Sequence, residues 1–169
     1  MSQHTLSVIV EDKPGVLARV SAMFSNRGFN IHSLAVGPTH VDGRSHVTLV
    51  VDAPELEQVK KQLHKLINVI KVQELDTTEA LQSEVMIARV SCEPANRGQL
   101  SDTASLFNAR MIDLSPTSMT FDIAGTPNQL ASFEEHMKPH GIMDLVKSGR
   151  VAMKKLSDIS PAVMGAQSR

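Results

Sequence analysis

The stretch that decides the fold is EDKPGVLARVSAMFSNRGFNIHSL, residues 11–34. Its apolar side chains recur at the spacing of one helical face, and they are Val16, Leu17, Val20, Met23 and Phe24. Pro14 and Gly15 come before this pattern, and Gly28 comes after it. Proline suits a helix start and glycine suits a helix end. We therefore predict one amphipathic helix from about Gly15 to Gly28, between two strands.

The start of this helix has the features of an anion-binding site. Gly15 has no Cβ to block a group that approaches the exposed amides of Gly15, Val16 and Leu17. Such amides favour a carboxylate or a phosphate. Asn30 follows the turn after the helix and offers one amide oxygen and one NH2 group. We expect the anion site and the Asn30 amide to lie close together.

The rest of the chain repeats one order of elements. In the first half, strands are predicted over 4–11, 30–39, 44–52 and 69–75, with a second helix over 54–68. Residues 76–83 are polar and predict a linker. In the second half, strands are predicted over 84–92, 111–115, around 119–123 and over 141–153, with a kink near Ser148-Gly149 and helices over 99–108 and 127–137. The predicted order of strands and helices is therefore βαββαβ in each half of the chain.

An offset of 83 residues aligns the two halves at four identical pairs, which are Gly15/Gly98, Leu17/Leu100, Phe24/Phe107 and Arg27/Arg110. The second half lacks the Asp-x-Pro-Gly of the first, because residues 94–97 read Pro-Ala-Asn-Arg. The ligand site is therefore expected in the first copy only. The predicted division is 1–76, a linker over 77–83, a second domain over 84–155 and a loose tail over 156–169.

Ten positions at fixed spacing resemble the signature of ACT domains, which are ferredoxin-like βαββαβ modules that bind amino acids at domain interfaces. They are Asp12, Pro14, Gly15, Leu17, Val20, Phe24, Gly28, Asn30, Ile31 and Leu34. The resemblance continues through 62–72, 111–116 and 141–153. The chain is similar to the small regulatory subunits of acetolactate (acetohydroxyacid) synthase. The expected fold is α+β, with an N-terminal ACT domain and a related C-terminal domain in tandem.

The resemblance implies a non-catalytic subunit that acts in valine, leucine and isoleucine biosynthesis. It would activate the large catalytic subunit and confer feedback inhibition by valine or another branched-chain amino acid. It further implies a homodimer through the ACT domains, no cofactor in this chain, and thiamine diphosphate, Mg and FAD in the catalytic partner. The alternative is a free-standing tandem ACT sensor that controls a transcription regulator.

The same resemblance predicts which residues bind the amino acid. Its carboxylate would meet the amides of Gly15, Val16 and Leu17, and its ammonium would meet an oxygen of Asp12 or Asn30. Its apolar end would meet the second strand, at Ile31, Leu34 and Ala35. A local alternative stays open for each group: Asp12, Gly15 and Asn30 suit an ordinary turn, and the apolar residues suit a core or a dimer contact.

Composition argues against several other classes of protein. A formal net charge of −1 gives no general attraction to nucleic acid or anionic membrane, and aromatic residues at 3% leave little for base stacking. A single cysteine, Cys92, excludes an internal disulfide and a cysteine-cluster metal site. The N-terminus has no basic start, and no apolar run approaches the roughly 20 residues of a membrane span. These features predict a cytoplasmic protein.

The seven histidines do not predict a metal or catalytic site. With Asp42-Gly43 as a hairpin turn, opposed positions sum to 85, so that His46 faces Thr39 and His40 faces Ser45. No two histidines then pair, and no cysteine or carboxylate completes a ligand set. The sequence shows no Ser/His/Asp arrangement and no Walker-type phosphate loop. We predict neither catalytic residues nor a bound metal.

Overall fold

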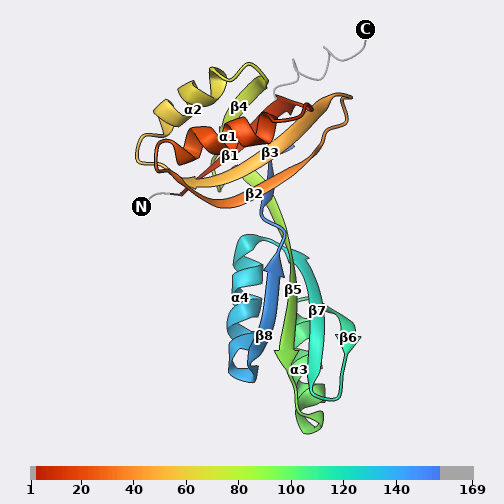
Figure 1. Cartoon of the computed structure of the whole chain (residues 1–169). Coiled ribbons are helices and arrows are strands. Elements are labelled where there is room, and N and C mark those ends of the chain that lie inside the picture. Colours follow the sequence, from red (N-terminus) through yellow and green to blue (C-terminus); the bar gives the residue numbers. More distant parts are fainter. Residues whose placement is uncertain (1–2, 157–169) are drawn as a thin grey trace. The chain divides into compact units, whose positions relative to one another are not determined.

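The structure is a computed structural model that describes residues 3–156. Residue contacts divide the chain into two compact units. Of the described residues, unit 1 takes 3–81 and 150–156, and unit 2 takes 82–149. Each unit is α+β, with an antiparallel sheet and two α-helices (Figure 1).

Unit 1 has the predicted order βαββαβ. Its elements are β1 (Gln3–Glu11), α1 (Val16–Ser25), β2 (Asn30–Pro38), β3 (Arg44–Asp52), α2 (Leu56–His64) and β4 (Val69–Leu75). The strand order is β2-β3-β1-β4, so β2 lies at one edge. In Figure 1, α1 and α2 lie over one face of this sheet. The ferredoxin-like fold expected for the first domain is confirmed.

The core of unit 1 lies between these helices and the sheet. Alternate residues of β1, which are Leu6, Val8 and Val10, point toward the helices and are buried. From α1, Val20 and Phe24 complete the contact and are also buried. The period of two along the strand and of about four along the helix explains why these residues, and not their neighbours, form the core.

Unit 2 repeats the same topology. Its elements are β5 (Ala80–Ser91), the short 3-10 helix η1 (Pro94–Asn96), α3 (Arg97–Leu106), β6 (Arg110–Leu114), β7 (Ser118–Gly125), α4 (Pro127–Met137), a second 3-10 turn η2 (Lys138–His140) and β8 (Ile142–Lys147). The strand order is β6-β7-β5-β8. The Phe133 ring packs edge-on against Phe107 and Phe121 in its core. The second ferredoxin-like domain is confirmed.

The segment between the units differs from the sequence-based expectation. The predicted linker over 77–83 is polar, yet β5 already begins at Ala80. The stretch predicted over 141–153 is broken at Gly149, which has φ +83°, and continues as β9 (Val151–Lys154), which pairs with β5. Burial of Ala80 and Ala152 against Leu75 forms a small cluster of its own. The end of the predicted second domain therefore packs in unit 1.

The internal repeat has an offset of 80 through its first half, not 83. Val20 and Leu100 are both buried at offset 80, whereas Leu17, which offset 83 pairs with Leu100, is 42% exposed. The ends of α1 and α3 also match at offset 80. The Phe29 amide donates to the Phe24 carbonyl, and the equivalent Ala109 amide donates to the Ala104 carbonyl. The four identities at offset 83 are therefore not structurally equivalent.

Candidate functional site

The helix start on which the prediction rests has an unusual backbone. Gly15 is the N-cap of α1 and has φ +81°, ψ −2°, in the left-handed region. A side chain is strained there, so glycine is required by conformation as well as by access. Asp12 lies just before this turn, and its amide donates to the carbonyl of Gly43 at 2.8 Å. The helix start is thereby tied to the tip of the β2–β3 hairpin.

Only part of the predicted amide group is available to a ligand. The Arg19 amide donates to the Gly15 carbonyl at 3.1 Å, as the first helical hydrogen bond. The Val16 amide already donates to the Lys13 carbonyl at 3.3 Å. The Leu17 amide precedes the first helical donor, so it has no acceptor within the helix. Of the predicted amides, that of Leu17 is therefore open to a ligand, whereas that of Val16 is already paired.

A network of charged and polar side chains surrounds this helix start. Glu11 Oε2 accepts from Lys13 Nζ at 2.9 Å and from Asn68 Nδ2 at 2.6 Å. These contacts, with that of Lys13 the larger, lower the pKa of the Glu11 carboxyl. Arg19 Nη1 donates to Asn68 Oδ1, which fixes the guanidinium beside the helix start.

Arg19 is a residue that the sequence analysis missed. A Cβ built on Gly15 would lie 3.8 Å from Arg19 Nη2. The guanidinium is therefore close to the approach to the open amides, where it adds a positive charge. The signal was present in the sequence, because residues four apart share one face of a helix.

A pocket of about 80 Å³ opens next to the helix start. Three predicted residues line it, namely Asp12, Val16 and Leu17. The other lining residues are Val10, Glu11, Lys13, Val20, Val36, Ser45 and Val47. The pocket thus has an apolar wall of valine and leucine and a polar rim, which suits a small aliphatic group with a charged head.

The apolar residues predicted on β2 lie elsewhere. Ile31 and Leu34 pack against the core of unit 1, and Ala35 pairs with Thr48 on the sheet face away from the helices. The β2 residue in the pocket is Val36, which is 48% exposed. Leu34 and Val36 lie on the same face of β2, so the period of two along the strand could have indicated Val36.

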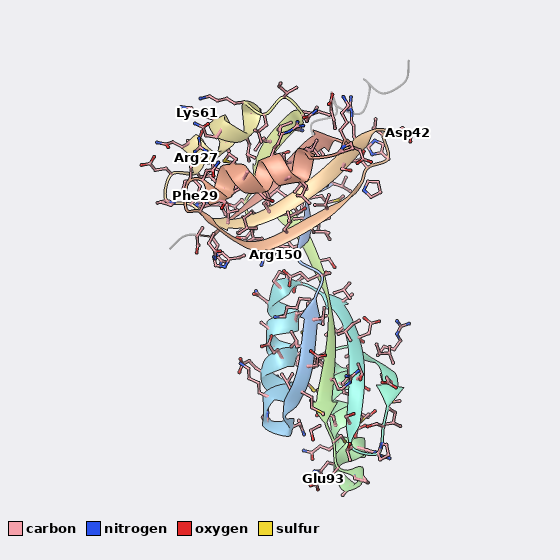
Figure 2. The ribbon with its side chains drawn as sticks, viewed as in Figure 1. Arg27, Phe29, Asp42, Lys61, Glu93 and Arg150 are labelled. Atoms are coloured by element: carbon pink, nitrogen blue, oxygen red, sulfur yellow. The ribbon has the colours of Figure 1, made fainter. Side chains whose placement is uncertain are left out.

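Asn30 lies far from the helix start within one chain. The β1–β3 ladder has nine residue pairs, from Gln3↔Asp52 to Glu11↔Arg44, and spans roughly 27 Å at 3.4 Å per residue. Asn30 pairs with Asp52 at one end, whereas Gly15 follows Glu11 at the other. Figure 2 shows these two ends through the labelled neighbours Phe29 and Asp42. The expectation that the two groups lie close together is wrong for a single chain.

The Asn30 end has a polar cluster of its own. His32 Nε2 and Asp52 Oδ2 are 2.6 Å apart. Asn30 Nδ2 lies 3.5 Å from His32 Nδ1 and 3.5 Å from His32 Nε2. The two groups predicted to bind parts of an amino acid thus lie at opposite ends of the sheet.

The histidine register differs from the one expected. Opposed positions near the hairpin sum to 83, so that His46 faces Gly37 and Ser45 faces Pro38, because the connection is longer than a two-residue turn. His46 Nε2 instead lies 2.7 Å from Ser7 Oγ of β1, and burial lowers the pKa of His46. Within residues 3–156, no three His, Cys, Asp or Glu side chains are grouped to hold a metal ion.

Two family descriptions match the chain. "AHAS small subunit-like ACT domain" matches residues 6–71, and "Small subunit of acetolactate synthase" matches residues 83–156. The chain belongs to the acetolactate synthase small-subunit family. Together the two matches cover both units, and they confirm the resemblance drawn from the sequence. None of the helices in the described part of the chain is long and apolar enough to cross a membrane.

Individual relatives agree with this family. The acetolactate synthase small subunit of Mycobacterium bovis is 47% identical over 154 residues, which are 90% of this chain and 92% of that protein. A probable acetolactate synthase small subunit of Archaeoglobus fulgidus is 42% identical over 153 residues, 89% of this chain and 96% of that one. The crystal structure of the Thermotoga maritima small subunit matches with a TM-score of 0.84 at 27% identity, over 92% of this chain and 98% of that chain.

Proposed function

We propose that this chain is a non-catalytic regulatory subunit of acetolactate synthase that binds valine, or a related branched-chain amino acid, between two copies of unit 1. Family membership supports the role of small subunit. Its partner would be the large catalytic subunit, which would carry the thiamine diphosphate, Mg and FAD. The amino acid would inhibit the partner in the pathway to valine, leucine and isoleucine.

The proposed ligand site rests on one observation. The helix start and Asn30, which would each bind part of the ligand, lie at opposite ends of β2. This strand is an edge of the sheet, so one side of its backbone is available for pairing with another strand. A two-fold axis would pair β2 with β2 of a second copy in antiparallel direction. If the midpoint of β2, Leu34, lies near the axis, Asn30 of one copy falls beside Pro38 of the other. Pro38 is at the hairpin end of the ladder, where the other copy's helix start lies.

Each part of the amino acid then has a chemical partner. The carboxylate would meet the Leu17 amide at the positive end of the helix dipole, with Arg19 beside it. The ammonium would meet Asp12 and the partner subunit's Asn30, through their oxygens. The isopropyl group would enter the pocket of about 80 Å³ at Val16 and Val36. One extra methylene changes binding in an apolar pocket by only about 1–3 kcal/mol, so isoleucine and leucine should compete with valine.

Inhibition follows by linkage. An amino acid that binds more tightly to the inhibited state of the complex shifts the complex toward that state, with a coupling free energy of typically about 1–3 kcal/mol. The ligand would set the distance between the helix start of one copy and the edge strand β2 of the other copy, because each contributes half of the site.

The decisive experiment is complementation between two defective subunits, measured by calorimetric titration with valine. Gly15→Asp places a carboxylate at the helix start, and Asn30→Ala removes the amide. Each homodimer should lose valine binding and valine inhibition of the reconstituted synthase.

A mixed dimer of the two variants has one site with both lesions and one site with none. It should regain valine binding at about one site per dimer, with near wild-type affinity. If both homodimers lose binding and the mixture recovers none, the shared site is wrong. If Asn30→Ala alone binds valine normally, Asn30 is not part of the site.

A further inference from the structure

The Asn30 end of β2 contains a residue arrangement that the proposed ligand contacts do not explain. The register of β2 on β3 shifts between Ile31 and Ser33, which makes His32 the extra residue of a β-bulge. A bulge re-aims a side chain. Asp52 pairs directly with Asn30 across the ladder, and its carboxylate lies 2.6 Å from His32 Nε2. Three polar side chains are thereby brought together at one corner of the sheet.

The chemistry of this contact determines which atoms donate. A carboxylate accepts only, so His32 Nε2 carries the hydrogen that it shares with Asp52. In the neutral imidazole, Nδ1 is then an acceptor. Asn30 Nδ2 lies 3.5 Å from both Nδ1 and Nε2, so the NH2 end of the amide faces the ring at the outer limit of hydrogen-bond distance. Among the described residues, Asn30 Oδ1 makes no side-chain hydrogen bond, so it is left to accept from another donor.

We propose that His32 and Asp52 are positioning residues, which hold the Asn30 amide with its oxygen toward the ammonium of the bound amino acid. The inference rests on the proposed function, because it assigns the role of Asn30 in that site. Without His32 and Asp52, the Asn30 amide is free to turn its NH2 group outward. The NH2 group and the ligand ammonium, which are both hydrogen-bond donors, would then face each other.

The second unit supports a functional reason for this pair. There β6 has the same bulge, between Met111 and Asp113, and its first residue, Arg110, pairs with Asp122. Arg110 Nη2 lies 2.6 Å from Asp122 Oδ2, and Ile112 stands where His32 stands in unit 1. The bulge thus forms without a histidine, so His32 is not needed for the backbone.

The burial of Asp52 is a second observation in favour of the positioning role. Its Oδ1 is buried and has no hydrogen-bond partner among the described residues, although the His32 and Asp52 side chains are 34% and 20% exposed. An unpaired buried oxygen is unfavourable for folding.

The test compares valine with 3-methylbutanoate, which keeps the carboxylate and the branched end and lacks the ammonium. Both ligands are titrated into the full chain and followed by NMR. His32→Ala and Asp52→Ala should each raise the Kd for valine roughly three- to tenfold, the effect of one positioning hydrogen bond. The Kd for 3-methylbutanoate should stay unchanged.

Two further variants make the result specific. His32→Gln keeps an N–H donor for Asp52 and an acceptor for Asn30, so it should restore the valine affinity. His40→Ala removes an exposed histidine of the same hairpin and should leave both ligands unaffected. Equal losses for both ligands, or no loss for valine, would overturn the positioning role. If Asn30→Ala weakens valine while His32→Ala does not, the proposed function stands and this inference fails.

Discussion

The two units share one backbone plan and differ where a ligand would bind. In unit 1, Gly15 turns the chain through a left-handed conformation and leaves the next amides open at the start of α1. In unit 2, the 3-10 turn Pro94–Asn96 leads straight into α3. No residue stands there in a left-handed conformation before the helix among those described. A shared fold therefore does not produce a shared helix-start site.

The second difference lies at the start of the second strand of each unit. Asn30 in unit 1 is replaced by Arg110 in unit 2, and the arginine is held by Asp122 in an ion pair. The same position thus offers a neutral amide in one copy and a neutralised cation in the other. The comparison teaches that two copies with an equivalent backbone can carry different side-chain chemistry at the same position.

The largest effect is expected from removing one aromatic ring from each core. Phe24 and Phe133 are both fully buried, so Phe24→Ala and Phe133→Ala should each lower the free energy of unfolding by about 3–5 kcal/mol. Only Phe24→Ala should also weaken valine binding, since Phe24 belongs to the core of the unit that would hold the site. Urea unfolding and valine titration test both. Loss of binding in Phe133→Ala would contradict a site confined to unit 1.

The next effect separates strain from charge at Gly15. With φ at +81°, a side chain carries a strain of about 1–3 kcal/mol, so both Gly15→Ala and Gly15→Asp should lose stability in thermal unfolding. The loss should be no greater for aspartate, which tolerates the left-handed region and the N-cap better than alanine. Gly15→Ala should weaken valine binding, and Gly15→Asp should abolish it, because only the aspartate repels the ligand carboxylate. Equal valine affinities in the two variants would argue against an anion at this helix start.

A smaller effect of opposite sign is expected at Gly98, which offset 83 aligns with Gly15. Gly98 lies within α3 and has no atom within 4 Å of a built Cβ. Gly98→Ala should therefore raise the free energy of unfolding by roughly 0.5–1 kcal/mol, because alanine is the better helix former. Chemical denaturation measures it. A destabilised Gly98→Ala would mean that the two glycines serve the same conformational purpose after all.

The smallest effect concerns His46, which faces Ser7 on the open side of the first sheet. Burial lowers its pKa below the ordinary value of 6.5, so the folded state binds fewer protons than the unfolded state. Stability is then lost as the pH falls below about 6.5. His46→Gln should lose less stability than the natural protein over that range. Unfolding free energies measured at several pH values test this, and parallel curves for the two proteins would refute it.

Elements with strong local signals were predicted well. The bounds of Arg44–Asp52, Val69–Leu75 and Pro127–Met137 match those expected, because alternation and turn residues act over short distances. The α2 helix is shorter than the predicted 54–68, since it ends at His64. Both registers, across the hairpin and between the repeats, were wrong by two or three residues, because turns and bulges absorb residues without a clear sequence signal.

The sequence by itself determined the family, the doubled βαββαβ order and the importance of Gly15, since spacing and glycine conformation are local properties of the chain. Only the tertiary structure decided that Arg19 and Val36 stand beside the helix start and that Asn30 lies at the far end of the same sheet. It also decided that Val151–Lys154 return to unit 1. The physical reason is that neighbours in space depend on strand direction and register, which long-range packing selects.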